Sequence, residues 1–381
     1  MVQIKRADNS KWGVLPLAIA LAGCSSASPS GPATGGSTPV EKPGSTAPAP
    51  TSGGAGTGAA AETSPGFYSM PGDDLAAPAA GKGYQIATPD YDAADPNASL
   101  MVVPPGQEVF LCYYVTLPNT GEVDIGGFQS YMTEGSSHHF IAYQVSGNGG
   151  AAVGMTQPSG TINTCSAGAG TWLYATSTPG EVIGFNLPEK VGLPFAAGAQ
   201  IMLNMHFINP GSTTLYPKVK LNLVSTTGAK YRAGTMVSFN RQINVPPATA
   251  SGPGTQTVSG TCTAPVGSKF FSMSTHTHKH ATAAVVNFVS AGSSQEIVHT
   301  GQASSYPADQ QQGTGTDWEH PGVGTWLAPN FLTIQTGDSF TYSCSYSNDG
   351  DTAVVVGNTA ATNEMCMAIG YYYPAGQVMC N

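Results

Sequence analysis

Short hydrophobic runs recur along the chain from about residue 66 to its end. The runs are rich in Val, Ile, Tyr, Phe and Thr, and clusters of Gly, Pro, Asn and Ser separate them. No window holds a helical apolar repeat for more than a turn or two. The pattern predicts strands at residues 108–117, 140–145, 200–208, 219–225, 283–290, 338–346 and 365–373.

These strands predict an all-β fold, in which sandwiches bury alternate faces of each sheet. Roughly 300 residues of such strands exceed a comfortable single hydrophobic core, so we expect two tandem β-sandwiches. A Pro/Gly/Thr-rich stretch within residues 235–254 is the best candidate for the boundary. We therefore predict one sandwich at residues 66–235 and a second at residues 236–381.

The first 23 residues are typical of a secretory signal peptide. A positively charged segment precedes an apolar stretch, residues 12–22, that is too short to span a membrane. Residues 21–24, Leu-Ala-Gly-Cys, resemble a bacterial lipobox, in which the cysteine is lipidated and becomes the first mature residue. The alternative is an ordinary signal peptide that is cut nearby.

Residues 24–65 consist mainly of Ser, Gly, Ala, Pro and Thr and contain almost no large apolar side chain. Such a segment cannot bury a core, so we expect a disordered linker. Ser25 follows Cys24, which by resemblance to known lipoproteins favours the outer membrane. We expect an exported protein whose only membrane attachment is the lipid on Cys24, in the bacterial cell envelope.

Charged residues make up only 9% of the chain, which also contains 48 Gly and 29 Pro. This composition suits an exported β-rich protein better than a cytosolic helical one. The net charge of −9 argues against nucleic acid or anionic lipid surfaces as partners. In an exported chain, the six cysteines after Cys24 imply three disulfides with fifteen possible pairings. They are Cys112, Cys165, Cys262, Cys344, Cys366 and Cys380, and none has the CxxC spacing of a zinc ribbon or a thioredoxin.

Three of the eight histidines lie two residues apart, at His276, His278 and His280. On a regular strand all three would project from one face. Neighbouring rings would then be about 7 Å apart, at roughly 3.3 Å per residue, and two of them could converge on one metal ion. The alternative is three partly exposed histidines on a sheet surface.

Two further histidines, His138 and His139, precede a predicted strand, and His206 lies within another. Adjacent residues on a regular strand face opposite ways, so His138 and His139 can share a metal only across a strand end or a bulge. The turn-forming residues 134–137 could supply one. With His206 they would form an all-nitrogen site suited to copper or zinc. The alternative is one buried, hydrogen-bonded histidine and one exposed histidine.

A methionine on an apolar strand is far more often core than ligand, but the order of motifs gives Met365 a context. The motifs are His138-His139, His206, His276-Thr277-His278, and Glu364-Met365-Cys366 followed by three tyrosines. This set resembles the copper type II, ascorbate-dependent monooxygenases, which include peptidylglycine α-hydroxylating and dopamine β-monooxygenases. The resemblance covers roughly residues 96–381, where residues 110–118 look like the family's first core strand.

The resemblance implies two jelly-roll β-sandwiches, each with one copper site. His138, His139 and His206 would hold an electron-transfer copper, and His276, His278 and Met365 an oxygen-activating copper. Imidazoles suit both oxidation states of copper, and a thioether favours Cu(I). Family members hydroxylate an activated C–H bond with O₂ and electrons that usually come from ascorbate. The implied disulfides are Cys112–Cys165, Cys262–Cys380 and Cys344–Cys366.

The departures from the family concern the substrate. Peptide-amidating members bind a substrate carboxylate with an Arg, an Asn and a Tyr, where this chain has Ser274, Met367 and Ile369. A C-terminal glycine peptide is therefore an unexpected substrate, although Asn204 keeps an amide where those members have Gln. His280 matches no family ligand, and we favour an exposed position for it over a role in orienting a ligand.

These observations predict a lipid-anchored dicopper monooxygenase that acts on a small organic or peptide-derived substrate with O₂ and a reductant such as ascorbate. His276, His278 and Met365 would carry the catalysis. One alternative is a non-catalytic copper-binding or copper-buffering lipoprotein on the same scaffold. Another is a structural β-sandwich lipoprotein whose histidines bind zinc or nothing. Met365 argues against the zinc alternative, because zinc sites are built from Cys, His and carboxylate ligands.

Overall fold

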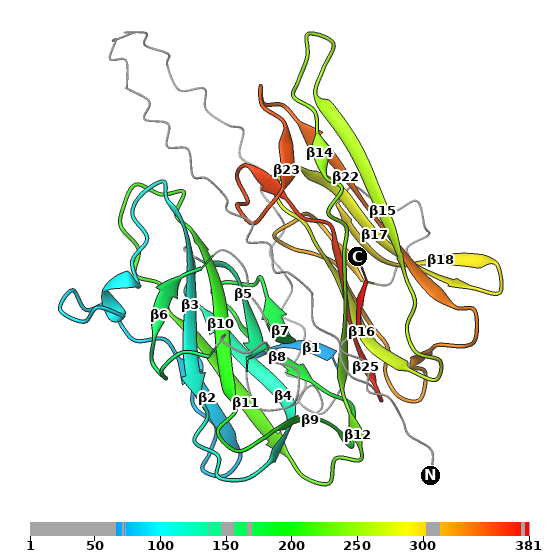
Figure 1. Ribbon diagram of the computed structural model, residues 1–381. Coiled ribbons are helices and arrows are strands. Elements are labelled where there is room, and N and C mark those ends of the chain that lie inside the picture. The colour runs from blue at the N-terminus through cyan, green and yellow to red at the C-terminus, as the bar shows by residue number, and fades with distance from the viewer. Residues whose placement is uncertain are drawn as a thin grey trace, which may run out of the picture. The chain divides into compact units, whose positions relative to one another are not determined.

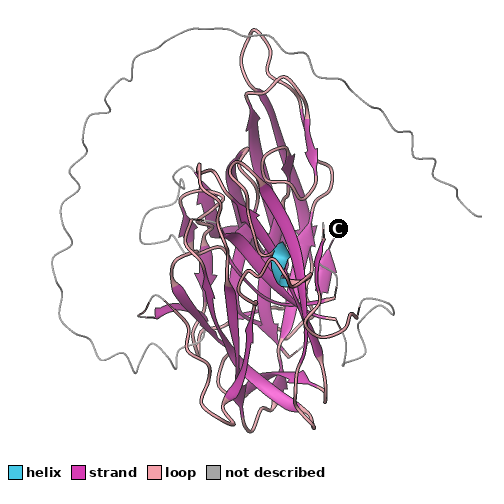
Figure 2. Ribbon diagram, turned by 90° about the vertical axis from the view of Figure 1, so that its left-hand side faces the viewer, coloured by secondary structure: helices cyan, strands magenta, loops and turns pink. Residues whose placement is uncertain are grey.

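Strands account for nearly all the regular structure in the computed structural model, and Figure 2 shows one short helical turn beside them. That turn is a 3-10 helix at Ala98–Leu100. The structure describes residues 66–70, 72, 74–135, 137–145, 156–165, 170–301, 313–374 and 378–380. The prediction of an all-β fold is confirmed, whereas the jelly-roll connectivity and the domain boundaries stay predictions.

Two sheets are built from residues before 233. The seven-stranded sheet contains β1 (Gly66–Met70), β8 (Val182–Asn186), β4 (Val123–Met132), β11 (Val219–Thr226) and β2 (Gly83–Ala87), with β9 (Val191–Phe195) and β12 (Tyr231–Arg232) beside them. The five-stranded sheet contains β6 (Ile162–Thr164), β3 (Glu108–Thr116), β10 (Gln200–Ile208), β5 (Ser137–Gln144) and β7 (Thr171–Thr176). In Figure 1 these strands run from blue to green.

Three sheets are built from the rest of the chain. The six-stranded sheet contains β20 (Val323–Thr325), β16 (Lys269–His276), β25 (Met367–Tyr373), β13 (Gly234–Phe239), β26 (Val378–Cys380) and β21 (Leu332–Thr333). A second sheet contains β15 (Gly254–Cys262), β22 (Ser339–Asn348), β17 (Ala281–Ser290), β18 (Ser293–Gly301) and β19 (Thr314–Gly315). A small third sheet contains β14 (Asn244–Val245), β23 (Val354–Val356) and β24 (Asn363–Glu364).

The strand β25 is buried on both of its faces, which explains its unbroken apolar sequence. Ile369 and Tyr371 belong to the hydrophobic core of the earlier sheets, whereas Ala368 and Tyr372 belong to the core of the later sheets. Its neighbour β16 divides its side chains in the same way, and the two strands run side by side in Figure 1. The six-stranded sheet therefore separates two hydrophobic cores.

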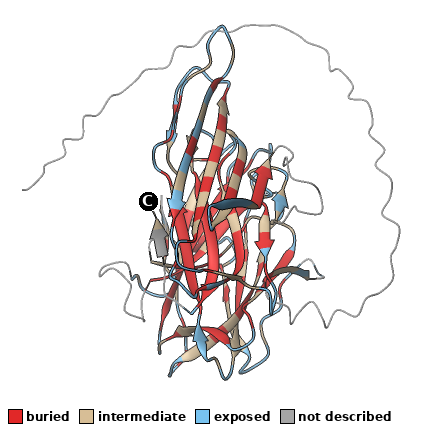
Figure 3. Cartoon of the chain, turned by 90° about the vertical axis from the view of Figure 1, so that its right-hand side faces the viewer, coloured by how far each residue is buried: buried red, intermediate tan, exposed pale blue. Residues whose placement is uncertain are grey.

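Other strands show the alternation that is expected where one face is buried. Along β22, every second residue is buried, and bands of buried and less buried residues alternate along several strands in Figure 3. Two buried aromatic residues of β22, Phe340 and Tyr342, belong to the second core. The alternation identifies that face of β22 as the inner one.

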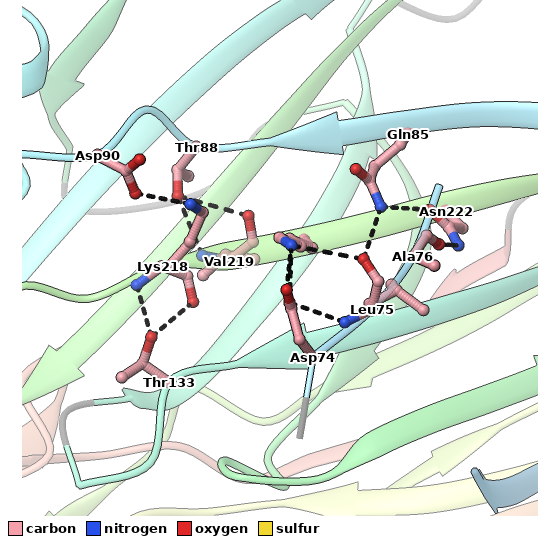
Figure 4. A network of polar contacts seen from close by, with 11 residues as sticks. Asp74, Leu75, Ala76, Gln85, Thr88, Asp90, Thr133, Lys218, Val219 and Asn222 are labelled. Atoms are coloured by element: carbon pink, nitrogen blue, oxygen red, sulfur yellow. Dashed lines mark hydrogen bonds and ion pairs between the residues drawn. The ribbon is translucent and has the colours of Figure 1, made fainter. Parts of the chain in front are cut away.

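A polar network fixes the segment around β2 to the seven-stranded sheet (Figure 4). Asn222 is fully buried in β11, where its amide donates to the backbone carbonyl of Ala76 at 2.8 Å and accepts from Gln85 at 3.0 Å. Lys220 pairs with Asp74 at 2.7 Å. Because these partners satisfy the hydrogen bonds of the buried amide, the network anchors residues 74–76 to the sheet.

Three disulfides link Cys112 to Cys165, Cys262 to Cys380, and Cys344 to Cys366. These pairs are the ones that the family resemblance implied. The first joins β3 to the residue that follows β6 in the same sheet, and the third joins β22 to the residue that follows Met365.

His276, His278 and His280 do not share one regular strand, so the arrangement in which all three project from one face is not present. β16 ends at His276, and β17 begins at Ala281 after a turn. The backbone N–H groups of His278 and His280 donate to the Glu364 carboxylate, at 2.9 and 2.7 Å, instead of continuing a sheet ladder. A buried side-chain acceptor therefore ends the strand earlier than the alternating pattern suggested.

The predictions of a signal peptide at residues 1–23, of lipidation at Cys24 and of a linker at residues 24–65 lie outside the described residues. Among the residues that the structure does describe, no helix has the length and apolar character needed to cross a membrane.

Candidate metal centre

Three histidines from two neighbouring strands form a cluster of possible metal ligands. His206 on β10 lies opposite His139 on β5, and the register shifts there, so that Phe207 pairs with residue 137. The shift is a β-bulge that leaves His138 as the extra residue and turns its side chain toward the same side as His139. One ligand nitrogen from each of the three histidines lies within 4.8 Å of the others. Of the two arrangements that the sequence allowed, a strand end or a bulge, the bulge is therefore present.

Glu108 fixes the orientation of His206. Its Oε1 lies 2.6 Å from Nε2 of His206, and the His206 ring stacks on Phe110 at 4.0 Å between ring centroids. Burial disfavours ionisation of Glu108, but hydrogen bonds from His206 and from the Ala360 N–H outweigh it and lower its pKa. An ionised carboxylate can only accept, so Nε2 of His206 carries the proton and donates. In the neutral ring, Nδ1 is then a bare lone pair.

His278 is oriented in a similar way by a backbone carbonyl. Its Nδ1 lies 3.1 Å from the carbonyl oxygen of Asn363, which can only accept, so Nδ1 carries the proton. Nε2 is then bare, and it is buried without a hydrogen-bond partner among the described residues. The ring of His276 lies 5.3 Å from that of His278, edge to face.

Met365 lies beside these two histidines along the chain path. Asn363, two residues before it, contacts His278, and Met367, two residues after it, pairs with His276 in the sheet. The hydroxyl of Tyr346 donates to the Met365 carbonyl at 2.9 Å. The Met365 segment is therefore pinned next to both histidines.

Burial keeps the five clustered histidines neutral. It lowers the pKa of His138 and His139 well below the ordinary value, with a further lowering from neighbouring histidines. Burial also lowers the pKa of His206, against the opposing effect of Glu108. The pKa of His276 falls to about 3 and that of His278 to about 4, again mainly through burial. Neutral imidazole is the form that binds a metal ion.

The two sets of histidines are contiguous. The rings of His139 and His276 lie 5.1 Å apart, edge to face. Nε2 of His138, Nδ1 of His139 and Nδ1 of His206 are buried and have no hydrogen-bond partner among the described residues. Because buried polar atoms are normally paired, unpaired imidazole nitrogens that point at one another fit a metal ion. Imidazole ligands with a nearby thioether suit copper.

A cavity of about 650 Å³ opens beside the histidines and touches one from each set, His139 and His276. Its walls are largely aromatic and aliphatic, and the residues that carry them include Phe67, Tyr68, Trp172, Ile183, Ile369 and Tyr371. Nε1 of Trp172 donates to the hydroxyl of Tyr371 at 3.2 Å, which joins the earlier sheets to the later ones inside this wall. The described lining contains no Lys or Arg. Its only carboxylate, Glu319, belongs to an exposed loop.

Comparison with known proteins finds similarity to one family. The model of the copper type II ascorbate-dependent monooxygenase C-terminal domain matches residues 231–381. Dopamine beta-hydroxylase from Rattus norvegicus is 21% identical over 317 residues, which are 76% of this chain and 48% of that protein. The enzyme of the same name from Canis lupus familiaris is 24% identical over 210 residues, 51% of this chain and 31% of that protein. Residues 231–381 are therefore similar to the C-terminal domain of the copper type II, ascorbate-dependent monooxygenases, and a longer part of the chain is similar to two members of that family.

The family match and the two relatives differ in what they cover. The domain match contains His276, His278 and Met365, whereas the three-histidine cluster lies before it. The chain spans about half or less of the length of these curated relatives. Among solved structures, the major capsid protein P2 from bacteriophage PM2 gives a TM-score of 0.35 at 9% identity, covering 76% of this chain and 97% of that chain.

The sequence alone did not identify the residues that orient the proposed copper ligands. Nothing in the sequence links Glu108 to His206 or Asn363 to His278, because each contact joins distant segments. Glu364 was visible as part of the Glu-Met-Cys motif, but its contacts were not. Burial raises the pKa of Glu364 to about 7, although backbone N–H groups that include those of His278 and His280 act to lower it. The assignment of individual residues as ligands stays a prediction.

Proposed function

We propose that the protein is a copper-dependent monooxygenase that hydroxylates an activated C–H bond of a small organic or peptide-derived molecule, with O₂ and an external reductant such as ascorbate. The observation that carries this proposal is the contiguity of two sets of neutral histidines, all buried except the half-buried His276, at the edge of one cavity. Similarity to the copper type II, ascorbate-dependent monooxygenases supports copper and ascorbate as the cofactor and the electron source. The relatives' own names describe dopamine hydroxylation, which is a property of those proteins.

Two coppers per chain fit the donor sets. His138, His139 and His206 would hold one ion through imidazole nitrogens, and His276, His278 and Met365 would hold the other with a softer donor set. Bound copper supplies one-electron redox chemistry and the activation of O₂. The chain's own contribution is to keep the five imidazoles neutral and to aim the bare nitrogens of His206 and His278 into the site.

The cavity would receive the substrate. Ser274 and Ile369 line it, at two of the positions where peptide-amidating members of the family carry carboxylate-binding residues. Neither of these side chains carries a positive charge, so a substrate carboxylate would have no counter-ion there. This disfavours a C-terminal glycine peptide as the substrate. Aromatic walls favour a substrate with an apolar body.

The sequence of the first 65 residues, which lie outside the described residues, supports export and lipid attachment at Cys24 to the cell envelope.

 The envelope location and the lipid on Cys24 form part of this proposal, and their support comes from the sequence alone.

The experiment that tests the proposal uses purified chain that has been reconstituted with copper. Elemental analysis should give two coppers per chain, and copper should be retained in competition with equal zinc. Oxygen uptake with ascorbate is then measured against a panel of small molecules that carry benzylic or heteroatom-activated C–H bonds, and hydroxylated product is identified by mass spectrometry.

One copper per chain, or preferential zinc retention, would contradict the dicopper assignment. Two tightly bound coppers with no oxygen-dependent product from any compound would favour the copper-buffering alternative. Product that incorporates oxygen from labelled O₂ would support the monooxygenase.

A further inference from the structure

Glu108 contacts both halves of the described chain through a single oxygen atom. Its Oε1 lies 2.6 Å from Nε2 of His206 and 2.7 Å from the backbone nitrogen of Ala360, which donates to it. Glu108 begins β3, in the five-stranded sheet that carries His206. Ala360 is buried in the segment between β23 and β24, five residues before Met365.

The contact with His206 determines which nitrogen of that ring is available. Because the carboxylate accepts from Nε2, the opposite nitrogen, Nδ1, is left bare and buried, and the His206 ring lies 5.0 Å from that of His138 and 4.9 Å from that of His139. A carboxylate that accepts from a ligating imidazole fixes the orientation of the ring and increases its basicity. The stacked ring of Phe110 limits rotation of the imidazole on one side.

The contact with Ala360 links the same carboxylate to the segment that leads to the second set of residues. That segment continues through Asn363, whose carbonyl accepts from His278, to Met365. The hydrogen bonds between Ala360, Glu108 and His206 therefore form a continuous path from the three-histidine cluster to the backbone that positions the other histidine set.

We propose that Glu108 is a positioning residue that fixes the ligand nitrogen of His206 and holds the 360–365 segment against the three-histidine cluster. This proposal rests on the proposed copper chemistry for its His206 part only, because the Ala360 part concerns the metal-free protein. A change at Glu108 should therefore affect both sites, although the residue contacts neither Met365 nor His276 in any hydrogen bond that the structure records.

The test compares two variants of Glu108 with a matched control. Glu108→Gln keeps an oxygen acceptor and removes the charge, and Glu108→Ala removes both. Glu189→Gln makes the same change of charge at a side chain that is 85% exposed and pairs only with its neighbour Lys190 among the recorded ion pairs. Three quantities are measured in the full chain: copper affinity of the three-histidine site, its reduction potential, and the hydrogen-exchange rate of the Ala360 amide in metal-free protein.

We expect Glu108→Ala to weaken copper binding at the three-histidine site by about 10- to 100-fold, as is usual when the partner of a ligating histidine is lost. Glu108→Gln should raise the reduction potential, because a less basic imidazole stabilises Cu(II) less. A tenfold change in the ratio of Cu(II) to Cu(I) affinity corresponds to about 59 mV for one electron. Exchange at Ala360 should accelerate at least tenfold in Glu108→Ala and stay unchanged in Glu189→Gln.

A potential in Glu108→Gln equal to that of Glu189→Gln would overturn the role toward His206. Unchanged exchange at Ala360 in Glu108→Ala would overturn the link to the 360–365 segment. If Glu108→Ala does not fold, Glu108→Gln supplies the potential, and Glu108→Met, which keeps the side-chain volume and removes the acceptor, supplies the exchange rate. If wild-type protein binds no copper at the three histidines, the proposed function fails, and exchange at Ala360 still decides the second role of Glu108.

Discussion

The three-histidine cluster and the group around Met365 differ in how many parts of the chain hold them. The first draws all its residues from β5 and β10, two adjacent strands whose ladder and bulge fix the side chains. The second combines a strand end at His276, a turn at His278 and a segment close to 90 residues further along the chain at Met365. A sheet positions the first group, whereas contacts between distant segments position the second.

This difference has an energetic consequence. A ladder of backbone hydrogen bonds distributes the positioning of the first cluster's backbone over many residues, and Glu108 adds to it by orienting the ring of His206. The second group depends on a few tertiary contacts, notably the Glu364 carboxylate and the Cys344–Cys366 disulfide. Single substitutions within the second group should therefore separate the two sites.

The largest expected effect comes from Met365→Leu, which keeps the side-chain volume nearly unchanged. Such a swap usually costs less than about 1.5 kcal/mol of stability. Met365 is partly buried and packs against the hydrophobic core of the earlier sheets. If Met365 is the soft ligand, oxygen-dependent turnover should nevertheless fall by at least two orders of magnitude. The three-histidine site should still bind copper, and that copper should still accept and release an electron. Oxygen uptake and urea denaturation, measured on the same preparation, check both parts.

X-ray absorption at the copper edge of the reduced protein provides the control for that substitution. Wild-type protein should show a copper–sulfur scattering shell that is missing in Met365→Leu. Normal turnover in the variant, or no sulfur shell in the wild type, would falsify the ligand role of Met365 and leave it as a core residue.

Removing the disulfide beside Met365 should have the next largest effect. The bond joins cysteines separated by 22 positions, for which loop entropy gives about 3 kcal/mol. A Cys344→Ser/Cys366→Ser variant should lose about that much stability together with copper at the Met365 group. The matched Cys112→Ser/Cys165→Ser variant, with a separation of 53, should lose about 4 kcal/mol. Equal loss of copper from both sites in the first variant would show that the sites are not held independently.

The sequence predicted the first group better than the second, for a physical reason. The strand at residues 200–208 was predicted with the bounds that β10 has, because a long apolar run between turn residues is a local signal. The need for a bulge between His138 and His139 was also local, since adjacent residues on a strand face opposite ways. Geometry that arises within a strand or at its end can be read from neighbouring residues.

The contacts that shape the second group have no local signal. The end of β16 at His276 is set by Glu364, which is 86 residues from His278 along the chain. The contact between Glu108 and Ala360 spans 252 residues. The pattern of residues around His276 indicated a continuing strand, and only the folded chain shows the buried carboxylate that takes up its N–H groups. Family resemblance supplied the motif order but not these contacts.

Acid sensitivity is a property that the two histidine sets should share in the metal-free protein. The folded pKa of His276 is about 3 and that of His278 about 4, below the ordinary value of 6.5. The unfolded state therefore binds more protons below pH 6.5, and the free energy of unfolding falls as the pH falls. Each such histidine contributes at most about 1.4 kcal/mol per pH unit.

Urea denaturation of metal-free protein between pH 6.5 and 5.5 measures this dependence. The double variant His276→Gln/His278→Gln should have a shallower slope than the wild type, by roughly 2 kcal/mol over that unit of pH. An unchanged slope would mean that these two histidines titrate normally in the folded state.

Glu364→Gln should have a smaller, local effect. At pH 8, above its pKa of about 7, the carboxylate is ionised and accepts the N–H groups of His278 and His280. The amide has one acceptor oxygen in place of two, so one buried N–H loses its partner, at a cost of about 1–3 kcal/mol. Copper affinity should fall at the Met365 group and stay unchanged at the three histidines. Equal copper affinity at the Met365 group in the variant and in the wild type would show that Glu364 does not position that group.

The smallest effect should come from His280→Gln, which tests whether the second group uses two histidines or three. The His280 side chain is only partly buried, and its Nε2 lies 3.2 Å from the carbonyl oxygen of Ala361, a contact that a glutamine amide can keep. The contact with Glu364 belongs to the backbone N–H and survives the substitution. Copper stoichiometry should therefore stay at two, and stability should change by no more than about 0.5 kcal/mol. Elemental analysis and the Cu(II) electron paramagnetic resonance spectrum provide the measurement. Loss of one copper would identify His280 as a ligand and would make the Met365 group a three-histidine site as well, which would remove the difference in ligand sets between the two halves of the molecule.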